Sequence, residues 1–145
     1  MPRYLLDTNI LLNYVRGSDL AKRIEGTYRL TTLTTPAEAP LISIVVEGEI
    51  RKLALEFGWG AAKVRFLEQF LQQLVIVPVD ARTGVVQAYA RIDDYSQRNG
   101  HTMGKNDAWV AATAHVTTAT LLTTDHDFNH LDPLFLSRIW INPVT

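Results

Sequence analysis

Short apolar runs alternate with longer segments of helical periodicity along this chain. The runs that are typical of strands lie at residues 3–6, 40–43, 75–77, 120–123 and 137–141. Strands that alternate with helices in this way form a mostly parallel sheet that helices cover on both faces. The sequence therefore predicts an α/β protein, a three-layer α/β/α sandwich with a mostly parallel central sheet.

The helical segments are expected at residues 10–15, 20–25, 43–57, 61–74, 80–97 and from Asp107 onward. In residues 43–57, apolar residues recur at helical spacing, at Val46, Ile50, Leu53 and Phe57. Residues 61–74 have the same pattern from Val64 to Leu74. Glycines and prolines interrupt residues 17–40, so we expect only one short helix there, followed by a loop.

Composition restricts the function classes. The 145 residues contain no repeat and no linker, so we expect a single domain over residues 1–145. The absence of cysteine excludes disulfides, thiol nucleophiles and thiolate zinc sites. The 14 basic and 15 acidic residues nearly cancel, so nucleic acid would have to bind locally. No apolar run approaches a membrane span and no targeting peptide is recognised, so a cytoplasmic location is expected.

Acidic side chains follow two of the expected strands directly. Asp7 comes after the first strand, and Asp125 follows the strand at residues 120–123. In open parallel sheets the functional site lies beyond the carboxyl ends of the strands. Asp107, in the first turn of a helix, is expected at the same edge of the sheet. Glu49 borders the apolar stripe of its helix, whereas Glu47 falls on the opposite flank.

Carboxylates that converge in this way repel one another, and their pKa values rise on burial unless a cation lies among them. The hard cation Mg²⁺ suits such ligands, and Mn²⁺ fits the same set. The cluster therefore suits metal-assisted hydrolysis of phosphodiester bonds. Each acid alone also has a structural interpretation. Asp7 and Asp107 can stabilise helix N-termini, Asp125 and Asp127 can be turn residues, and Glu49 can be a solvated helix residue.

Four blocks together resemble the PIN-domain ribonucleases, and most closely the VapC-type toxins of toxin-antitoxin pairs. The blocks are residues 4–9, 43–50, 104–112 and 121–128. The resemblance implies a parallel sheet between helices and Mg²⁺- or Mn²⁺-dependent cleavage of RNA. It also implies a cognate antitoxin that blocks the acidic cleft, and a homodimer.

The resemblance also assigns roles to residues of this chain. The acidic metal-binding quartet matches Asp7, Glu49, Asp107 and Asp125, and Asp127 matches a neighbour that is frequently acidic. The polar positions that orient the acids or a metal-bound water match Asn9, Ser43 and Thr123. Next to these motifs, Lys105, Arg51 and Lys52 could contact RNA phosphates, although each can also be a solvated surface charge.

Other classes of site fit less well. A haloacid-dehalogenase-type phosphatase needs a second aspartate where this chain has Asn9, and the nucleotide-binding glycine and lysine motifs are absent. His126 and His130 are four residues apart, but no third zinc ligand converges on them. Trp109 is expected to pack in the core. Two alternatives stay open: a housekeeping RNA-processing nuclease of the same fold, and a non-catalytic interaction module.

Overall fold

A computed structural model describes residues 2–144 and contains one five-stranded sheet in the order β3-β2-β1-β4-β5. All neighbouring strands pair in parallel, with Leu5 of β1 opposite Leu41 of β2 and Leu121 of β4. The strands are β1 (Tyr4–Leu6), β2 (Leu41–Ser43), β3 (Val75–Val77), β4 (Thr120–Thr123) and β5 (Ser137–Trp140). The predicted parallel sheet is therefore confirmed.

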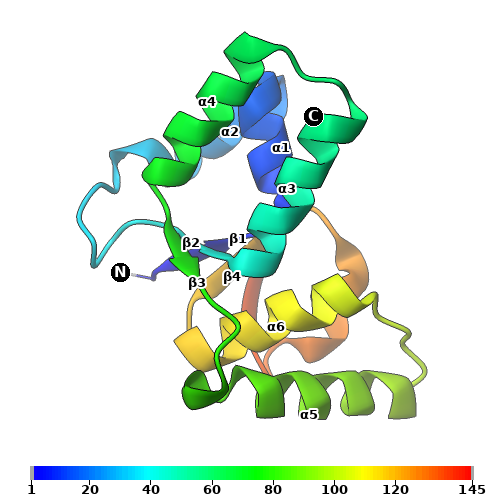
Figure 1. Ribbon diagram of the computed structural model, residues 1–145. Coiled ribbons are helices and arrows are strands. Elements are labelled where there is room, and N and C mark those ends of the chain that lie inside the picture. The colour runs from blue at the N-terminus through cyan, green and yellow to red at the C-terminus, as the bar shows by residue number, and fades with distance from the viewer. Residues whose placement is uncertain (1, 145) are drawn as a thin grey trace.

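Helices form a layer on each side of this sheet (Figure 1). One layer holds α1 (Thr8–Arg16), α2 (Asp19–Tyr28), α3 (Ile44–Glu56) and α4 (Ala61–Gln72). The other holds α5 (Val85–Arg98) and α6 (Lys105–Thr117). From β1 the chain first adds β2 and β3 on one side of β1, and it then returns to add β4 on the other side. Connections between parallel strands are right-handed, so connections that run in opposite directions along the sheet pass over opposite faces. The helices before β3 and those after it therefore lie in different layers. The expected α/β/α arrangement is confirmed.

The two central strands fix the position of the acidic residues. Leu5, Leu6, Leu121 and Leu122 are 0% exposed, because helices cover both faces of β1 and β4. The backbone pairing continues one residue beyond β1, where the Asp7 N–H donates to the carbonyl of Leu122 at 3.1 Å. The carboxyl ends of β1 and β4 are thereby held side by side, and the residues that follow them emerge at one edge.

Two expected helices have different boundaries. The helix expected over residues 80–97 begins only at Val85, because Asp80 caps a separate 3-10 turn, Ala81–Thr83, and Gly84 has φ +83°. A non-glycine residue adopts that left-handed conformation only at a cost. The short helix expected near residues 20–25 is longer, covering Asp19–Tyr28 with Ser18 as its N-cap, and a second 3-10 turn, Leu30–Thr32, follows it.

Several expected core positions lie at the surface instead. Phe57 is 49% exposed and Val64 is 38% exposed, because both lie at the distal ends of α3 and α4, where no other layer covers them. The last helix starts at Lys105 with Gly104 as N-cap, so Asp107 is in its first turn but is not its first residue. Within residues 2–144, no helix has the length and apolarity that crossing a bilayer requires.

Candidate active site

Asp7 is buried where the two central strands end. Only 6% of it is exposed, and it is the N-cap of α1. Its Oδ1 accepts a hydrogen bond from the backbone N–H of Thr8 at 2.8 Å, and its Oδ2 accepts one from the Thr123 hydroxyl at 2.8 Å. Asp7 therefore does cap α1, as the sequence allowed. The cap uses Oδ1, whereas Oδ2 is hydrogen-bonded to Thr123 of β4.

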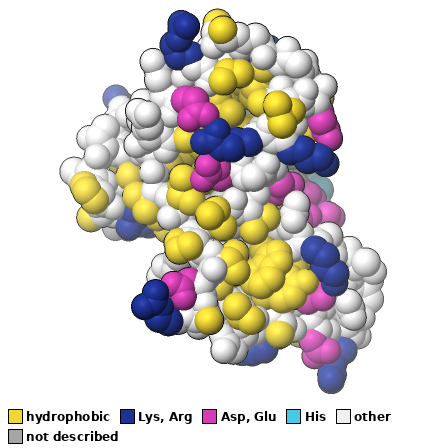
Figure 2. All heavy atoms as spheres, viewed as in Figure 1, with side chains coloured by type: hydrophobic (Ala, Val, Ile, Leu, Met, Phe, Trp, Pro, Cys, Tyr) yellow, Lys and Arg dark blue, Asp and Glu magenta, His cyan; other side chains and the backbone are white. Residues whose placement is uncertain are grey.

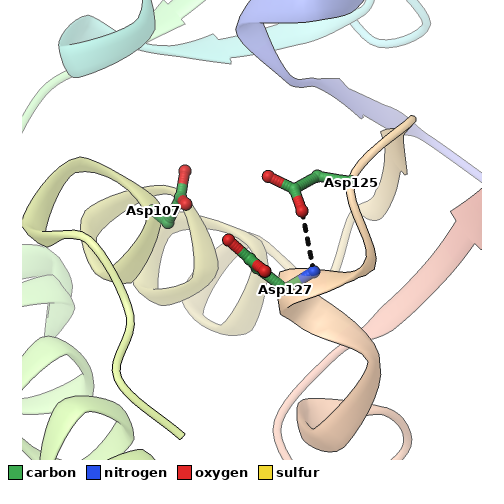
Figure 3. A group of neighbouring side chains, drawn as sticks. All are labelled: Asp107, Asp125 and Asp127. Carbon is green, nitrogen blue, oxygen red and sulfur yellow. Dashed lines mark hydrogen bonds between the residues drawn. The ribbon is translucent and has the colours of Figure 1, made fainter.

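Three further carboxylates meet beside this position. One carboxylate oxygen from each of Asp107, Asp125 and Asp127 lies within 4.8 Å of the others. Figure 3 shows them facing one another from α6, from the turn after β4 and from the 3-10 helix His126–Leu131 (η3). The Asp127 N–H donates to Asp125 Oδ1 at 2.8 Å, which fixes the orientation of the Asp125 carboxylate. Figure 2 shows acidic side chains gathered where the two halves of the molecule meet.

Glu49 approaches the same region from α3. Its Oε1 accepts a hydrogen bond from the Thr8 hydroxyl at 3.1 Å, so Thr8 connects Asp7 with Glu49. Glu47 does not take part, because its carboxylate forms a 2.8 Å ion pair with Arg51. Of the two glutamates in this segment, Glu49 is the one that lies at the N-terminus of α1.

Burial and neighbouring charges raise the pKa values of Asp7 and Asp107. Burial is the largest cause of the raised pKa of Asp7, about 6, and the charges of Glu49 and Asp125 add to it. The hydrogen bonds from Thr123 and Thr8 act in the opposite direction but only in part. Burial also raises the pKa of Asp107 to about 7, helped by the four other acidic charges. Asp107 is therefore close enough to feel the charge of each of the other four acids.

No basic side chain neutralises this group. Among residues 2–144, none of the five acids forms an ion pair within 4.0 Å with lysine, arginine or histidine. The ligands available are oxygens only, which is the type that Mg²⁺ and Mn²⁺ prefer. The donor set therefore fits a hard divalent cation, and such a cation would relieve the repulsion that contributes to the raised pKa values.

The three polar residues expected to orient the acids differ in their contacts. The Thr123 side chain is 0% exposed, and its hydroxyl both donates to Asp7 Oδ2 and accepts from the Asp125 N–H at 3.0 Å. Ser43 is also fully buried, and its hydroxyl caps α3 by accepting from the Val45 N–H at 3.1 Å. Asn9 donates to the Thr124 hydroxyl at 3.3 Å, next to Asp125.

The basic residues proposed for RNA are exposed but already have partners. Lys105 contacts Asp93 at 3.0 Å, and Lys52 contacts Glu56 at 3.3 Å. Arg51 is hydrogen-bonded to both Glu47 and Glu68. RNA phosphates would have to compete with these pairs. Trp109 is partly buried, packs against the core and stacks on Tyr89 with ring centroids 3.9 Å apart.

Thr8 is a site residue whose role the sequence does not reveal. It stands beside Asp7 at the start of α1, but its hydrogen bond to Glu49 spans 41 residues. No local pattern indicates such a long-range contact. The same holds for the ion pair between Asp93 and Lys105.

Replacing Thr123 with valine should lower both stability and affinity for a divalent cation. The change leaves Asp7 Oδ2 without its donor and the Asp125 N–H without its acceptor, so we expect a loss of about 2 kcal/mol in the free energy of unfolding. Cation affinity should fall by roughly 10- to 100-fold, as is usual for residues that orient metal ligands. Denaturant unfolding and calorimetric titration with Mn²⁺ measure these effects.

Thr113→Val is the matched control, because Thr113 is equally buried but its hydroxyl donates within α6 to the Trp109 carbonyl. It should retain cation affinity. Equal losses in both variants would argue against a special position of Thr123.

The comparison with protein families identifies the class. A model of the PIN domain family matches residues 4–134, which include all five acids. The chain therefore belongs to the PIN domain family. No curated protein matches the sequence.

Solved structures share this fold at low sequence identity. A chain of VapBC2 from Rickettsia felis bound to a promoter DNA fragment is 24% identical, with a TM-score of 0.74, and the alignment covers 93% of this chain and 97% of that one. FitAcB from Neisseria gonorrhoeae gives 23% identity, a TM-score of 0.72 and coverages of 94% and 96%. VapBC-1 from nontypeable Haemophilus influenzae is 22% identical, with a TM-score of 0.71, and the alignment covers 94% of this chain and 96% of that one.

Proposed function

We propose that this protein is a metal-dependent endoribonuclease that hydrolyses phosphodiester bonds of RNA. The observation that carries the proposal is the meeting of Asp107, Asp125 and Asp127 beside Asp7 and Glu49, with no basic partner among residues 2–144. Five interacting carboxylates without a counterion are costly, so the arrangement favours a site that works with a cation. Membership of the PIN domain family supports nuclease chemistry.

In this proposal the cation is Mg²⁺, which Mn²⁺ can replace. The residues that would hold it are Asp107, Asp125 and Asp127, together with Asp7 and Glu49. When bound, the cation supplies Lewis-acid chemistry and neutralises charge at the phosphate under attack.

The chain's own residues orient the reactants. Thr123 and the backbone N–H of Thr8 hold Asp7 from two sides, and the Thr8 hydroxyl holds Glu49. Carboxylate oxygens held in this way can accept hydrogen bonds from the attacking water and direct it at the phosphorus. Lys105, Arg51 and Lys52 are proposed to contact the flanking RNA phosphates, exchanging their present partners for them.

The proposed biological role is that of the toxin in a toxin-antitoxin pair. The similar structures from Rickettsia felis and Haemophilus influenzae support it, because both contain a VapBC protein and VapBC is a family of toxin-antitoxin systems. A cognate antitoxin is then expected to cover the acidic site, with an arginine or lysine pairing with its carboxylates. Residues 1–145 would act as a single nuclease domain in the cytoplasm.

A homodimer is also proposed. Hydrophobic side chains gather on the lower half of the molecule in Figure 2, where α5 and α6 lie, and Val86 of α5 is 42% exposed. Self-association would cover such apolar surface. Without an antitoxin, the same nuclease site would suit a housekeeping RNA-processing enzyme.

The direct test is cleavage of structured RNA by the purified protein. We expect products only when Mg²⁺ or Mn²⁺ is present, and their complete loss when a chelator is added. Gel analysis of end-labelled RNA measures both. Cleavage that survives the chelator would contradict the metal requirement. A lack of cleavage with every RNA and both metals would favour the non-catalytic interaction module.

A further inference from the structure

A cavity opens next to the acidic site. Its volume is about 340 Å³, which lies within the range of small-molecule sites. Asp127 belongs both to its wall and to the carboxylate group, so the cavity adjoins the acidic site at this residue. The other lining residues are Gly100, His101, Thr102, Met103, His126, Asn129 and His130. We call this cavity the histidine pocket.

Aromatic rings in the histidine pocket are already stacked and held in place. The rings of His101 and His130 lie 4.0 Å apart and are inclined by 12°. The Ser96 hydroxyl is hydrogen-bonded to His130 Nε2 at 2.7 Å. The His130 ring is also parallel to the more distant ring of Tyr95. His101 is exposed and has His130 as its one ring partner among residues 2–144. It therefore forms the outer end of a stack.

Two other residues of the pocket wall, His126 and Asn129, also contact each other. The His126 ring stacks on Trp140 at 4.2 Å, and its Nδ1 lies 3.1 Å from the side-chain amide of Asn129. These imidazoles do not form a second metal centre. Within residues 2–144, the one group of three or more metal-ligating side chains contains aspartates alone.

We propose that the histidine pocket binds one unpaired RNA base next to the phosphodiester that is cleaved. The base would extend the stack of His130 and His101, while Thr102 and Asn129 offer hydrogen-bonding groups to its edge. Proteins recognise single-stranded RNA by this combination of ring stacking and edge contacts. The inference rests on the proposed nuclease function and adds to it a determinant of substrate choice.

The four histidines of this chain allow a test that requires neither metal nor catalysis. We expect titration of the metal-free protein with AMP, CMP, GMP and UMP to shift the imidazole NMR signals of His101, His126 and His130. His115 is the internal control, because it lies against Phe135 in a different cavity. The effect should differ among the four nucleotides. Ribose phosphate, which has no base, should leave the His101 and His130 signals unchanged.

Two substitutions separate stacking from other effects. His101→Ala should weaken nucleotide binding about tenfold, whereas His101→Phe, which keeps an aromatic face, should retain most of it. In cleavage assays, His101→Ala should raise KM and change the preferred cleavage positions, with kcat little changed. Equal shifts at all four histidines, shifts produced by ribose phosphate, or equal weakening in both variants would overturn the proposal. These NMR results do not depend on nuclease activity, so the failure of one proposal is distinguishable from the failure of the other.

Discussion

Replacing Asp7 with asparagine should abolish RNA cleavage and at the same time stabilise the metal-free protein above neutral pH. Asparagine keeps the volume of Asp7 and an oxygen for the Thr8 N–H, so α1 retains its cap. The negative charge is lost at the centre of the site, however. We expect activity to fall by a factor on the order of 10³, the size of effect seen when a central electrostatic group is removed.

The stability gain follows from burial. Because the pKa of Asp7 is raised to about 6, its ionised form costs free energy when the protein folds above that pH. The variant should therefore unfold at a higher temperature than the wild type at pH 7.5, and the advantage should vanish near pH 4. Thermal unfolding with chelator present measures it.

Asp94→Asn is the control for both measurements, because Asp94 is exposed and pairs only with Arg98 on the outside of α5. It should leave cleavage unchanged. Full nuclease activity in Asp7→Asn would show that the site assignment is wrong, whereas a destabilised variant would show that other groups of the folded protein compensate the charge of Asp7.

The metal-free wild type should lose stability as the pH rises from about 4 to about 7, and a divalent cation should restore it. The pKa of Asp7 is raised to about 6 and that of Asp107 to about 7. The folded state therefore binds protons more tightly than the unfolded state in this range, so deprotonation favours unfolding. For Asp7 the upward shift corresponds to roughly 3 kcal/mol.

A bound cation would replace those protons. Mn²⁺ or Mg²⁺ should raise the unfolding temperature at pH 7.5 by several degrees and have little effect near pH 5, because ligand binding to the folded state stabilises it. Calorimetry across this range, with chelator or with metal, measures both effects. A metal-free protein whose stability rises steadily with pH would contradict the prediction.

His130 has the opposite effect on stability from the two aspartates. Burial lowers its pKa, so acidification below the ordinary pKa of histidine lowers the free energy of unfolding. The double variant Asp7→Asn/Asp107→Asn isolates the acids, because it keeps the contribution of His130. It should lose the stabilisation at low pH and the response to metal together.

The sequence predicted the fold and the edge where the acids lie for physical reasons. Asp7 directly follows β1, Asp125 comes one residue later after β4, and the parallel order brings the carboxyl ends of those strands together. Helix periodicity likewise indicated that Glu49 faces inward more than Glu47. Both predictions use only the spacing of residues along the chain. In a parallel sheet, that spacing is enough to indicate which residues lie at the same edge.

Other features depend on contacts that no local pattern contains. The apolar spacing of Val85, Ala88 and Ile92 continues a helical pattern, so it could not reveal that Gly84 interrupts the helix expected from residue 80. The bond between Thr8 and Glu49 and the stacking of His101 on His130 join separate elements. The exposure of Phe57 reflects where the covering layer ends, which the amphipathic pattern of α3 does not encode.

The order of strands in the sheet also bears on biosynthesis. β1 is the strand next to β4, yet Asp7 and Asp125 lie far apart in the sequence. During translation, Asp7 and Glu49 are synthesised long before Asp107, Asp125 and Asp127. A nascent chain therefore cannot assemble the five carboxylates until Asp127 has been added, and a product that stops before Asp107 lacks three of them.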